Sequence, residues 1–130
     1  MDRVPILKIG DILLVSIQID MEDHVALQLQ ENLADRIVET GCHGVIIDIT
    51  GVPAVDTQVA QHILKTVVAA RLMGADCIIS GIRPQIAQTI VALGIEFGDI
   101  ATKASLADAL RYVLGRTEQA RTGASKRPER

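Results

Sequence analysis

The chain has 130 residues, the size of one ordinary domain, and 48% of them are hydrophobic, enough to form a core. Aromatic residues make up only 2%, so the core must be aliphatic, and recognition of bases or sugars by aromatic stacking is disfavoured. Residues 1–114 hold 8 basic and 14 acidic side chains, whereas residues 115–130 hold 5 basic and 2 acidic ones. An acidic body has no electrostatic footprint for nucleic acid, so we expect no such partner.

Motifs for membranes, metals and catalysis are missing from the sequence. No secretory segment opens it and no apolar run reaches about 18 residues, which predicts a cytoplasmic protein that does not insert into membranes. Cys42 and Cys77 are too few for a disulfide scaffold. His24, His43 and His62 lack other ligands at zinc-site spacing, and neither a glycine-rich phosphate loop nor a nucleophile elbow is found. We therefore expect neither an enzyme nor a bound cofactor.

The first third of the chain predicts a hairpin followed by a helix. Two apolar runs, Ile6–Ile9 and Ile12–Ile19, are separated by the turn-forming pair Gly10-Asp11, which indicates a β-hairpin. Between His24 and Thr40 the apolar residues approach a spacing of about 3.6, so this segment is expected to be an amphipathic helix. Gly41 is suited to ending it.

The middle of the chain predicts two buried strands around a second helix. Val45–Ile49 is a nearly continuous apolar run, typical of a strand that is buried on both faces. A loop with Gly51 and Pro53 leads into a helix over Thr57–Leu72. Asp76–Ser80 is then expected to form a second buried strand.

The last part predicts two more helices and a short strand. Pro84 suits the first turn of a helix that reaches Leu93. An extended piece over Phe97–Ala101 precedes a helix over Ser105–Leu114, where Ser105 and Asp108 resemble a capping box. The order β-β-α-β-α-β-α-β-α predicts an α/β fold with a mixed central sheet and about four helices.

The end of the chain differs from the rest in composition. Residues 115–130 hold no aliphatic side chain larger than alanine and are basic, so we predict a disordered tail behind a domain of residues 1–114.

The segment Asp48–Thr57, D-I-T-G-V-P-A-V-D-T, leaves a buried strand and enters a helix through a Gly/Pro loop. It places Thr57 at a helix N-terminus, where unpaired N–H groups and the helix dipole tolerate a phosphate. The residues alone also allow a simpler interpretation, in which Asp56 or Thr57 is an N-cap.

Three strings carry a resemblance to a known family. The segment above resembles the phosphorylation loop of STAS domains, Gly81–Ile90 (G-I-R-P-Q-I-A-Q-T-I) is similar to the matching part of RsbR proteins, and Ile6–Gln18 resembles the start of RsbS. The resemblance covers about residues 4–114 and implies a STAS (SpoIIAA-like) fold. RsbS proteins typically carry serine where Thr57 stands here, so the chain resembles an RsbS-type scaffold with an RsbR-like switch motif.

The resemblance also implies a role and partners. Such STAS domains assemble with RsbR-type paralogues into a large oligomer, the stressosome, which holds an RsbT-type serine/threonine kinase. Phosphorylation of the scaffold releases the kinase, and an RsbX-type phosphatase resets the system. By this resemblance Thr57 is the phosphate acceptor. Thr89 corresponds to a second one, although it could instead be a helix hydroxyl bound to a backbone carbonyl.

The implied switch loop draws on two segments of the chain. Asp48 and Asp56 could orient the Thr57 hydroxyl or help to repel the product phosphate from a docked partner, although Asp48 could simply cap loop amides. Arg83 could pair with a phosphate, or be simply an exposed arginine or a contact to a partner. The expected residues of this switch loop are Asp48, Thr50, Gly51, Asp56, Thr57, Gly81 and Arg83.

Two other functions fit the same sequence. One is a small anti-anti-sigma factor that binds an anti-sigma kinase directly, without a large assembly. The other is a STAS domain that binds a nucleotide or another anion at the helix N-termini that begin near Thr57 and Pro84.

Overall fold

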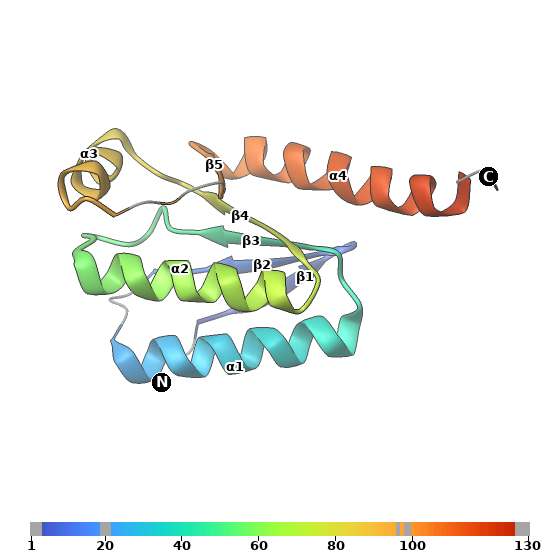
Figure 1. Cartoon of the computed structure of the whole chain (residues 1–130), viewed down its shortest axis with the longest axis horizontal. Helices are drawn as coiled ribbons and strands as arrows, with labels where there is room; N and C mark the ends of the chain where they lie inside the picture. The colour runs from blue at the N-terminus through green and yellow to red at the C-terminus, as the bar shows by residue number, and fades with distance from the viewer. Residues whose placement is uncertain (1–3, 19–21, 96, 98–99, 127–130) are drawn as a thin grey trace.

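The computed structural model of the chain describes residues 4–18, 22–95, 97 and 100–126. Within these residues, five strands form one sheet in the order β1-β2-β3-β4-β5, and four helices pack around it (Figure 1). The strands are β1 (Ile6–Ile9), β2 (Ile12–Ser16), β3 (Gly44–Asp48), β4 (Asp76–Ser80) and β5 (Ala101–Lys103), and the helices are α1 (Asp23–Thr40), α2 (Thr57–Leu72), α3 (Pro84–Ala92) and α4 (Leu106–Lys126). Strand β1 is antiparallel to β2 and the other pairs are parallel, so the predicted mixed sheet and element order are confirmed.

The sheet is covered on both faces, which explains the continuous apolar runs in its central strands. Helices α1 and α2 cover one face and α4 lies on the other (Figure 1). In β2, Leu13 and Val15 belong to the core under α1 and α2, whereas Ile12 and Leu14 pack on the α4 side. Fully burying a side chain of this kind stabilises the fold by about 1.5–3 kcal/mol, so both layers hold the sheet in place.

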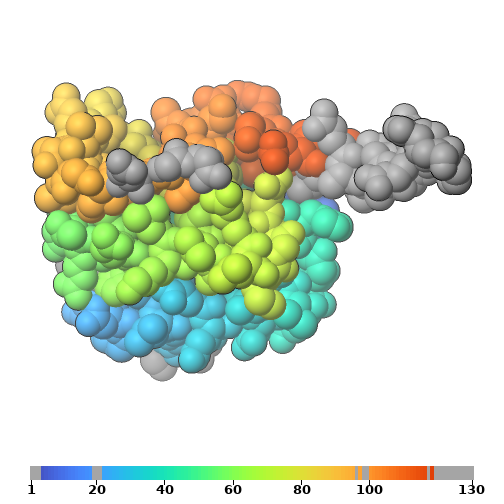
Figure 2. All heavy atoms as spheres, viewed as in Figure 1, coloured from blue at the N-terminus to red at the C-terminus, as the bar shows by residue number. Residues whose placement is uncertain are grey.

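Helix α3 lies apart from the helices that cover the two faces of the sheet. It sits at the end of the molecule where α2 begins, as both views show (Figures 1 and 2). Its buried residues Ile86 and Ile90 join the same core as α1 and α2. The start of α3 and the start of α2 are therefore close to the same edge of the sheet.

Two boundaries at the end of the chain differ from the sequence prediction. The last strand is Ala101–Lys103 rather than 97–101, because its position is set by parallel pairing with Ile78–Ser80 of β4. Helix α4 runs to Lys126 instead of ending at Leu114. The sequence 115–126 contains no proline, so nothing in it removes a helical hydrogen bond, although Gly115 and Gly123 lower its helix propensity. Residues 115–126 are helical in the structure, while the division of the chain at residue 114 and the disordered tail stay predictions.

The parallel strands β2, β3 and β4 finish at one edge of the sheet. Ser16, Asp48 and Ser80 are their last residues and are register partners, Ser16 with Asp48 and Asp48 with Ser80. The loops that leave this edge lead to the starts of α1, α2 and α3. The predicted switch residues belong to the segments that follow β3 and β4, so they are brought together at this edge of the sheet.

Candidate functional site

Thr57 is the first residue of α2, and its side chain is exposed. Asp56 precedes it as the N-cap, and Asp56 Oδ1 accepts a hydrogen bond of 2.8 Å from the Val59 N–H. The sequence left open which of the two caps the helix, and the structure assigns that part to Asp56. Thr57 thus stands in the first turn, where backbone N–H groups and the positive end of the helix dipole favour an added negative charge.

Asp48 ties two loops together at the ends of their strands. Its Oδ1 accepts hydrogen bonds from Thr50 Oγ1 at 2.9 Å and from Ser80 Oγ at 2.8 Å. Ser80 is fully buried, and the bond to Asp48 satisfies its hydroxyl. These two hydroxyl contacts were not predicted, and the capping of loop amides by Asp48 and its influence on Thr57 stay predictions.

Gly81 allows the two loops to approach closely. Its φ of 81° lies in the left-handed region, which alanine and larger residues disfavour. A Cβ atom at this position would collide with Thr50 Oγ1 and lie 2.7 Å from Thr50 N and 2.8 Å from Asp48 Oδ1. Gly51 is less confined, since a Cβ there would lie 3.0 Å from Gln18 Cγ and would require only a small shift of that residue. Gly81 is therefore the glycine on which the packing of the two loops depends.

Arg83 lies at the start of α3 and is partly buried, not exposed as one interpretation of the sequence held. Its Nη2 donates a hydrogen bond of 2.7 Å to the backbone oxygen of Val52, in the loop before Thr57. Its Nε is buried and has no hydrogen-bond partner among the described residues. Arg83 is thus a second link between the two loops.

Thr89 lies in α3 and is half-buried. Its Oγ1 donates a hydrogen bond of 2.9 Å to the backbone oxygen of Gln85, one turn earlier. This is the backbone contact that the sequence analysis gave as the alternative to phosphorylation. The role of Thr89 as a second acceptor stays a prediction, and it would require the hydroxyl to leave Gln85.

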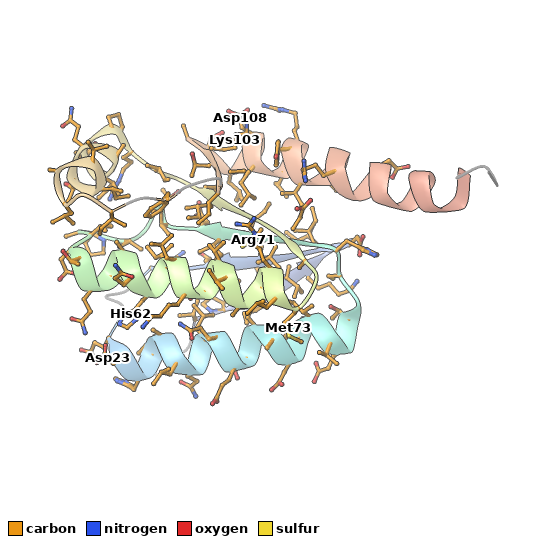
Figure 3. All side chains as sticks on the ribbon, viewed as in Figure 1. Asp23, His62, Arg71, Met73, Lys103 and Asp108 are labelled. Carbon is orange, nitrogen blue, oxygen red and sulfur yellow. The ribbon has the colours of Figure 1, made fainter. Side chains whose placement is uncertain are left out.

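Another polar cluster joins α1 to the first turns of α2. Asp23 Oδ1 accepts a hydrogen bond of 2.7 Å from Gln58 Nε2 and lies 2.8 Å from His62 Nε2 (Figure 3). The hydrogen bond with His62, and then that from Gln58, lower the pKa of Asp23 below its usual value. Neither this cluster nor the contact of Ser80 was predicted from the sequence, because the partners are distant along the chain. A signal for Ser80 was available, since β3 and β4 have the same length and each ends in a polar residue, Asp48 and Ser80.

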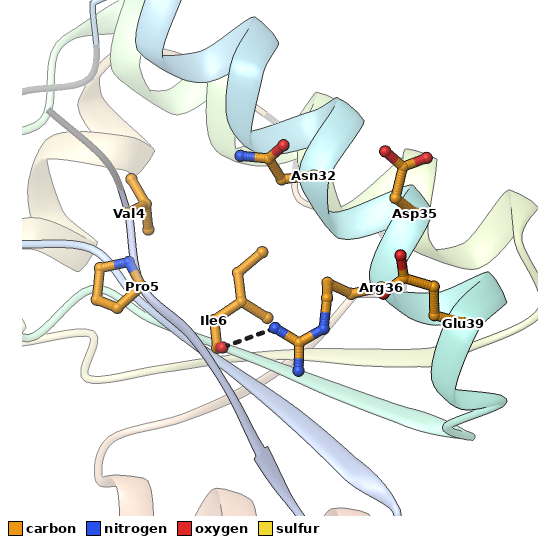
Figure 4. Close-up of a pocket in the computed structure, with 7 residues that line it drawn as sticks. All are labelled: Val4, Pro5, Ile6, Asn32, Asp35, Arg36 and Glu39. Carbon is orange, nitrogen blue, oxygen red and sulfur yellow. Dashed lines mark hydrogen bonds between the residues drawn. The ribbon is translucent and has the colours of Figure 1, made fainter.

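A surface pocket lies between β1 and α1 and includes none of the predicted switch residues. Arg36 Nη1 donates a hydrogen bond of 3.2 Å to the backbone oxygen of Ile6 and so fastens the helix to the edge strand (Figure 4). The lining residues are Val4, Pro5, Ile6, Asn32, Asp35, Arg36 and Glu39.

Two further features concern the part of the chain that the structure describes, namely metal-binding groups and membrane-spanning helices. There, no group of three or more His, Cys, Asp or Glu side chains is placed to hold a metal ion. In the same part, no helix is both long and apolar enough to span a membrane.

The STAS domain family model matches residues 3–109. The chain belongs to the STAS domain family. The RsbT co-antagonist protein RsbRA of Bacillus subtilis (strain 168) is 47% identical over 94 residues, which cover 72% of this chain and 34% of that protein. The STAS domain described here therefore spans about a third of the length of this curated relative.

Solved structures of other proteins resemble this STAS domain. A variant of RsbS from Moorella thermoacetica is 29% identical with a TM-score of 0.75, and the match covers 88% of this chain and 97% of that one. A chain from a structure titled "Molecular architecture of the stressosome, a signal integration and transduction hub" is 27% identical with a TM-score of 0.73, covering 87% and 98%. The predicted family and the STAS fold are confirmed.

Proposed function

We propose that this STAS domain is a non-enzymatic, partner-switching scaffold that binds an RsbT-type serine/threonine kinase and releases it when Thr57 is phosphorylated. The observation that carries the proposal is the exposed Thr57 at the start of α2, directly after the capping Asp56. The likeness to an RsbT co-antagonist supports the choice of kinase. In this proposal the protein is cytoplasmic and assembles with RsbR-type paralogues into a large oligomer, and an RsbX-type phosphatase restores the initial state.

The acceptor is tested by incubating the chain with the kinase and ATP and mapping phosphopeptides by mass spectrometry. We expect Thr57→Ala to abolish the main phosphopeptide while the protein stays folded, because Asp56 and not Thr57 caps the helix. Thr102→Ala is a matched control, since Thr102 is also exposed but lies on β5. Thr89→Ala separates a second acceptor from the first. Full phosphorylation of Thr57→Ala would reject the assignment.

Kinase release is tested with Thr57→Glu. The helix N-terminus gains about 0.3–1 kcal/mol from an acidic side chain, so circular dichroism should report an intact fold. The kinase should bind more weakly, since a like charge beside Asp56 can cost up to several kcal/mol at an interface. A folded Thr57→Glu variant that binds as tightly as the parent argues against release by charge.

Assembly distinguishes the scaffold from a small anti-anti-sigma factor. In sedimentation with an RsbR-type paralogue, a scaffold forms a very large particle, whereas the anti-anti-sigma factor remains a monomer or dimer.

A further inference from the structure

Two loops at the carboxyl edge of the sheet are fastened to each other. The loop after β3 leads to Thr57, and the loop after β4 leads to Arg83 and α3. At the strand ends, Ser80 Oγ donates to Asp48 Oδ1 and the Ile49 N–H donates 2.9 Å to the Ser80 backbone oxygen. These two contacts fix the positions at which the loops begin. They do not fix the path of the first loop from Ile49 to Thr57.

The contact of Arg83 with Val52 reaches the part of the loop beyond the strand end. Val52 is buried, and its N–H donates a hydrogen bond of 3.0 Å to the Ile49 backbone oxygen, which closes a turn. Arg83 Nη2 binds the carbonyl oxygen of the same residue at 2.7 Å. A hydrogen bond from a charged group is about twice as strong as a neutral one. Arg83 therefore clamps this turn from the neighbouring loop.

The clamp has a feature that stability alone does not explain. Arg83 Nε is buried without a hydrogen-bond partner among the residues described, and leaving a buried donor unsatisfied opposes folding. The guanidinium is nevertheless held against the loop that carries the acceptor.

We propose that Arg83 is a positioning residue for phosphorylation: by clamping Val52, it fixes the loop over residues 49–56 and so the place at which Thr57 meets the kinase. This inference rests on the proposed function, in which Thr57 is the acceptor. Arg83 acts through the loop and does not touch the reacting hydroxyl.

Amide hydrogen exchange in the full chain tests the clamp without the kinase. The Val52 amide reports on the loop, and the Ile17 amide, which donates 3.0 Å to the Asp48 backbone oxygen, reports on the sheet. Arg83→Gln should speed exchange at Val52 about tenfold, the factor that corresponds to about 1.4 kcal/mol, and leave Ile17 unchanged. Arg83→Lys should fall between parent and Arg83→Gln. Arg111→Gln, at an exposed arginine of α4, is the matched control and should change neither amide.

Phosphorylation kinetics then test the positioning. We expect kcat/KM at Thr57 to fall about tenfold in Arg83→Gln, which is within the loss that a small misplacement can cause, and to recover in part in Arg83→Lys. Arg111→Gln should keep the parental value.

Three results would overturn the inference. They are unchanged Val52 exchange in Arg83→Gln, an equal rise at Val52 and Ile17, and faster Val52 exchange with unchanged kcat/KM. Should the parent not be phosphorylated at Thr57, the proposed function fails, and Val52 exchange alone still decides whether Arg83 fixes the loop.

Discussion

Replacing Gly81 with alanine places a methyl group between the two loops of the site. The methyl carbon would collide with Thr50 Oγ1 and lie 2.7 Å from the Thr50 backbone nitrogen, so the loop itself must move. The φ of 81° adds a second penalty, because alanine is strained in the left-handed region. Both effects act at the contact that holds Asp48, Thr50 and Ser80 together.

The magnitude follows from these two effects. Left-handed strain costs about 1–2 kcal/mol, and forcing an extra methyl group into a packed site costs about 1–3 kcal/mol. We therefore expect Gly81→Ala to lower the free energy of unfolding by about 2–5 kcal/mol. Gly94→Ala is the matched control, because Gly94 has a φ of 72° and its Cβ would meet nothing within 4 Å. It should lose only the strain, about 1–2 kcal/mol.

Urea unfolding followed by circular dichroism measures both variants against the parent. If the slope of the free energy with urea stays constant, the shift in midpoint gives the difference in stability. A Gly81→Ala variant that loses no more stability than Gly94→Ala would refute the close packing of the two loops.

Three further predictions concern other parts of the chain. Deleting residues 115–130 removes the 2.6 Å ion pair of Arg116 with Asp76. Both side chains are about half exposed, so urea unfolding should show that the free energy of unfolding falls by less than about 1 kcal/mol. A larger loss would mean that the helical extension is part of the stable domain. Burial raises the pKa of Cys77 to about 12, so its alkylation by iodoacetamide near neutral pH, followed by mass spectrometry, should be about tenfold to a hundredfold slower than that of a free thiol, because the smaller thiolate fraction outweighs the greater nucleophilicity of a more basic thiolate. Rapid alkylation of the folded protein would contradict that burial. Because the folded state lowers the pKa of Asp23, its contribution to stability is present above the ordinary pKa of 3.8 and lost as pH falls through the lowered one. Asp23→Asn should flatten the acid part of the stability profile, and identical profiles for variant and parent would show that the contact with His62 does not affect folding.

Local patterns were sufficient for the elements that carry strong periodicity. Thr57–Leu72 and Asp76–Ser80 were predicted with the bounds that the structure has, because a helix cap, an apolar stripe and turn glycines are all readable within a few residues. The position of β5 was wrong because three residues beside β4 carry little pattern of their own. The end of α4 was misplaced because residues 115–126 carry no apolar periodicity from which a helix can be predicted.

The candidate site was predictable as a place but not as a set of contacts. The buried strand, the Gly/Pro loop and the helix that follows it were sufficient to place Asp56 and Thr57 at a helix start, as found. The contacts of Asp48 with Ser80 and of Arg83 with Val52 depend on the register of two strands and on the course of two loops, which are properties of the assembled sheet. Thr89 is the opposite case. Its hydrogen bond to the Gln85 backbone oxygen requires only a helix, so a contact of this kind could be predicted from the sequence as an alternative to phosphorylation.

These contacts bear on how a phosphate at Thr57 would act, if Thr57 is the acceptor. The helix start accepts the charge locally, and the preceding loop is held by buried Val52 and Val55 and by the Arg83 bond. Added charge is therefore not expected to unfold the domain. Its main effect is on a partner that binds over the exposed Thr57 surface, because like charges that lose their water at an interface oppose binding. Under the proposed function, a scaffold built this way would be switched and reset without leaving its folded state, because the fixed loop would present the same surface to the proposed kinase and phosphatase each time.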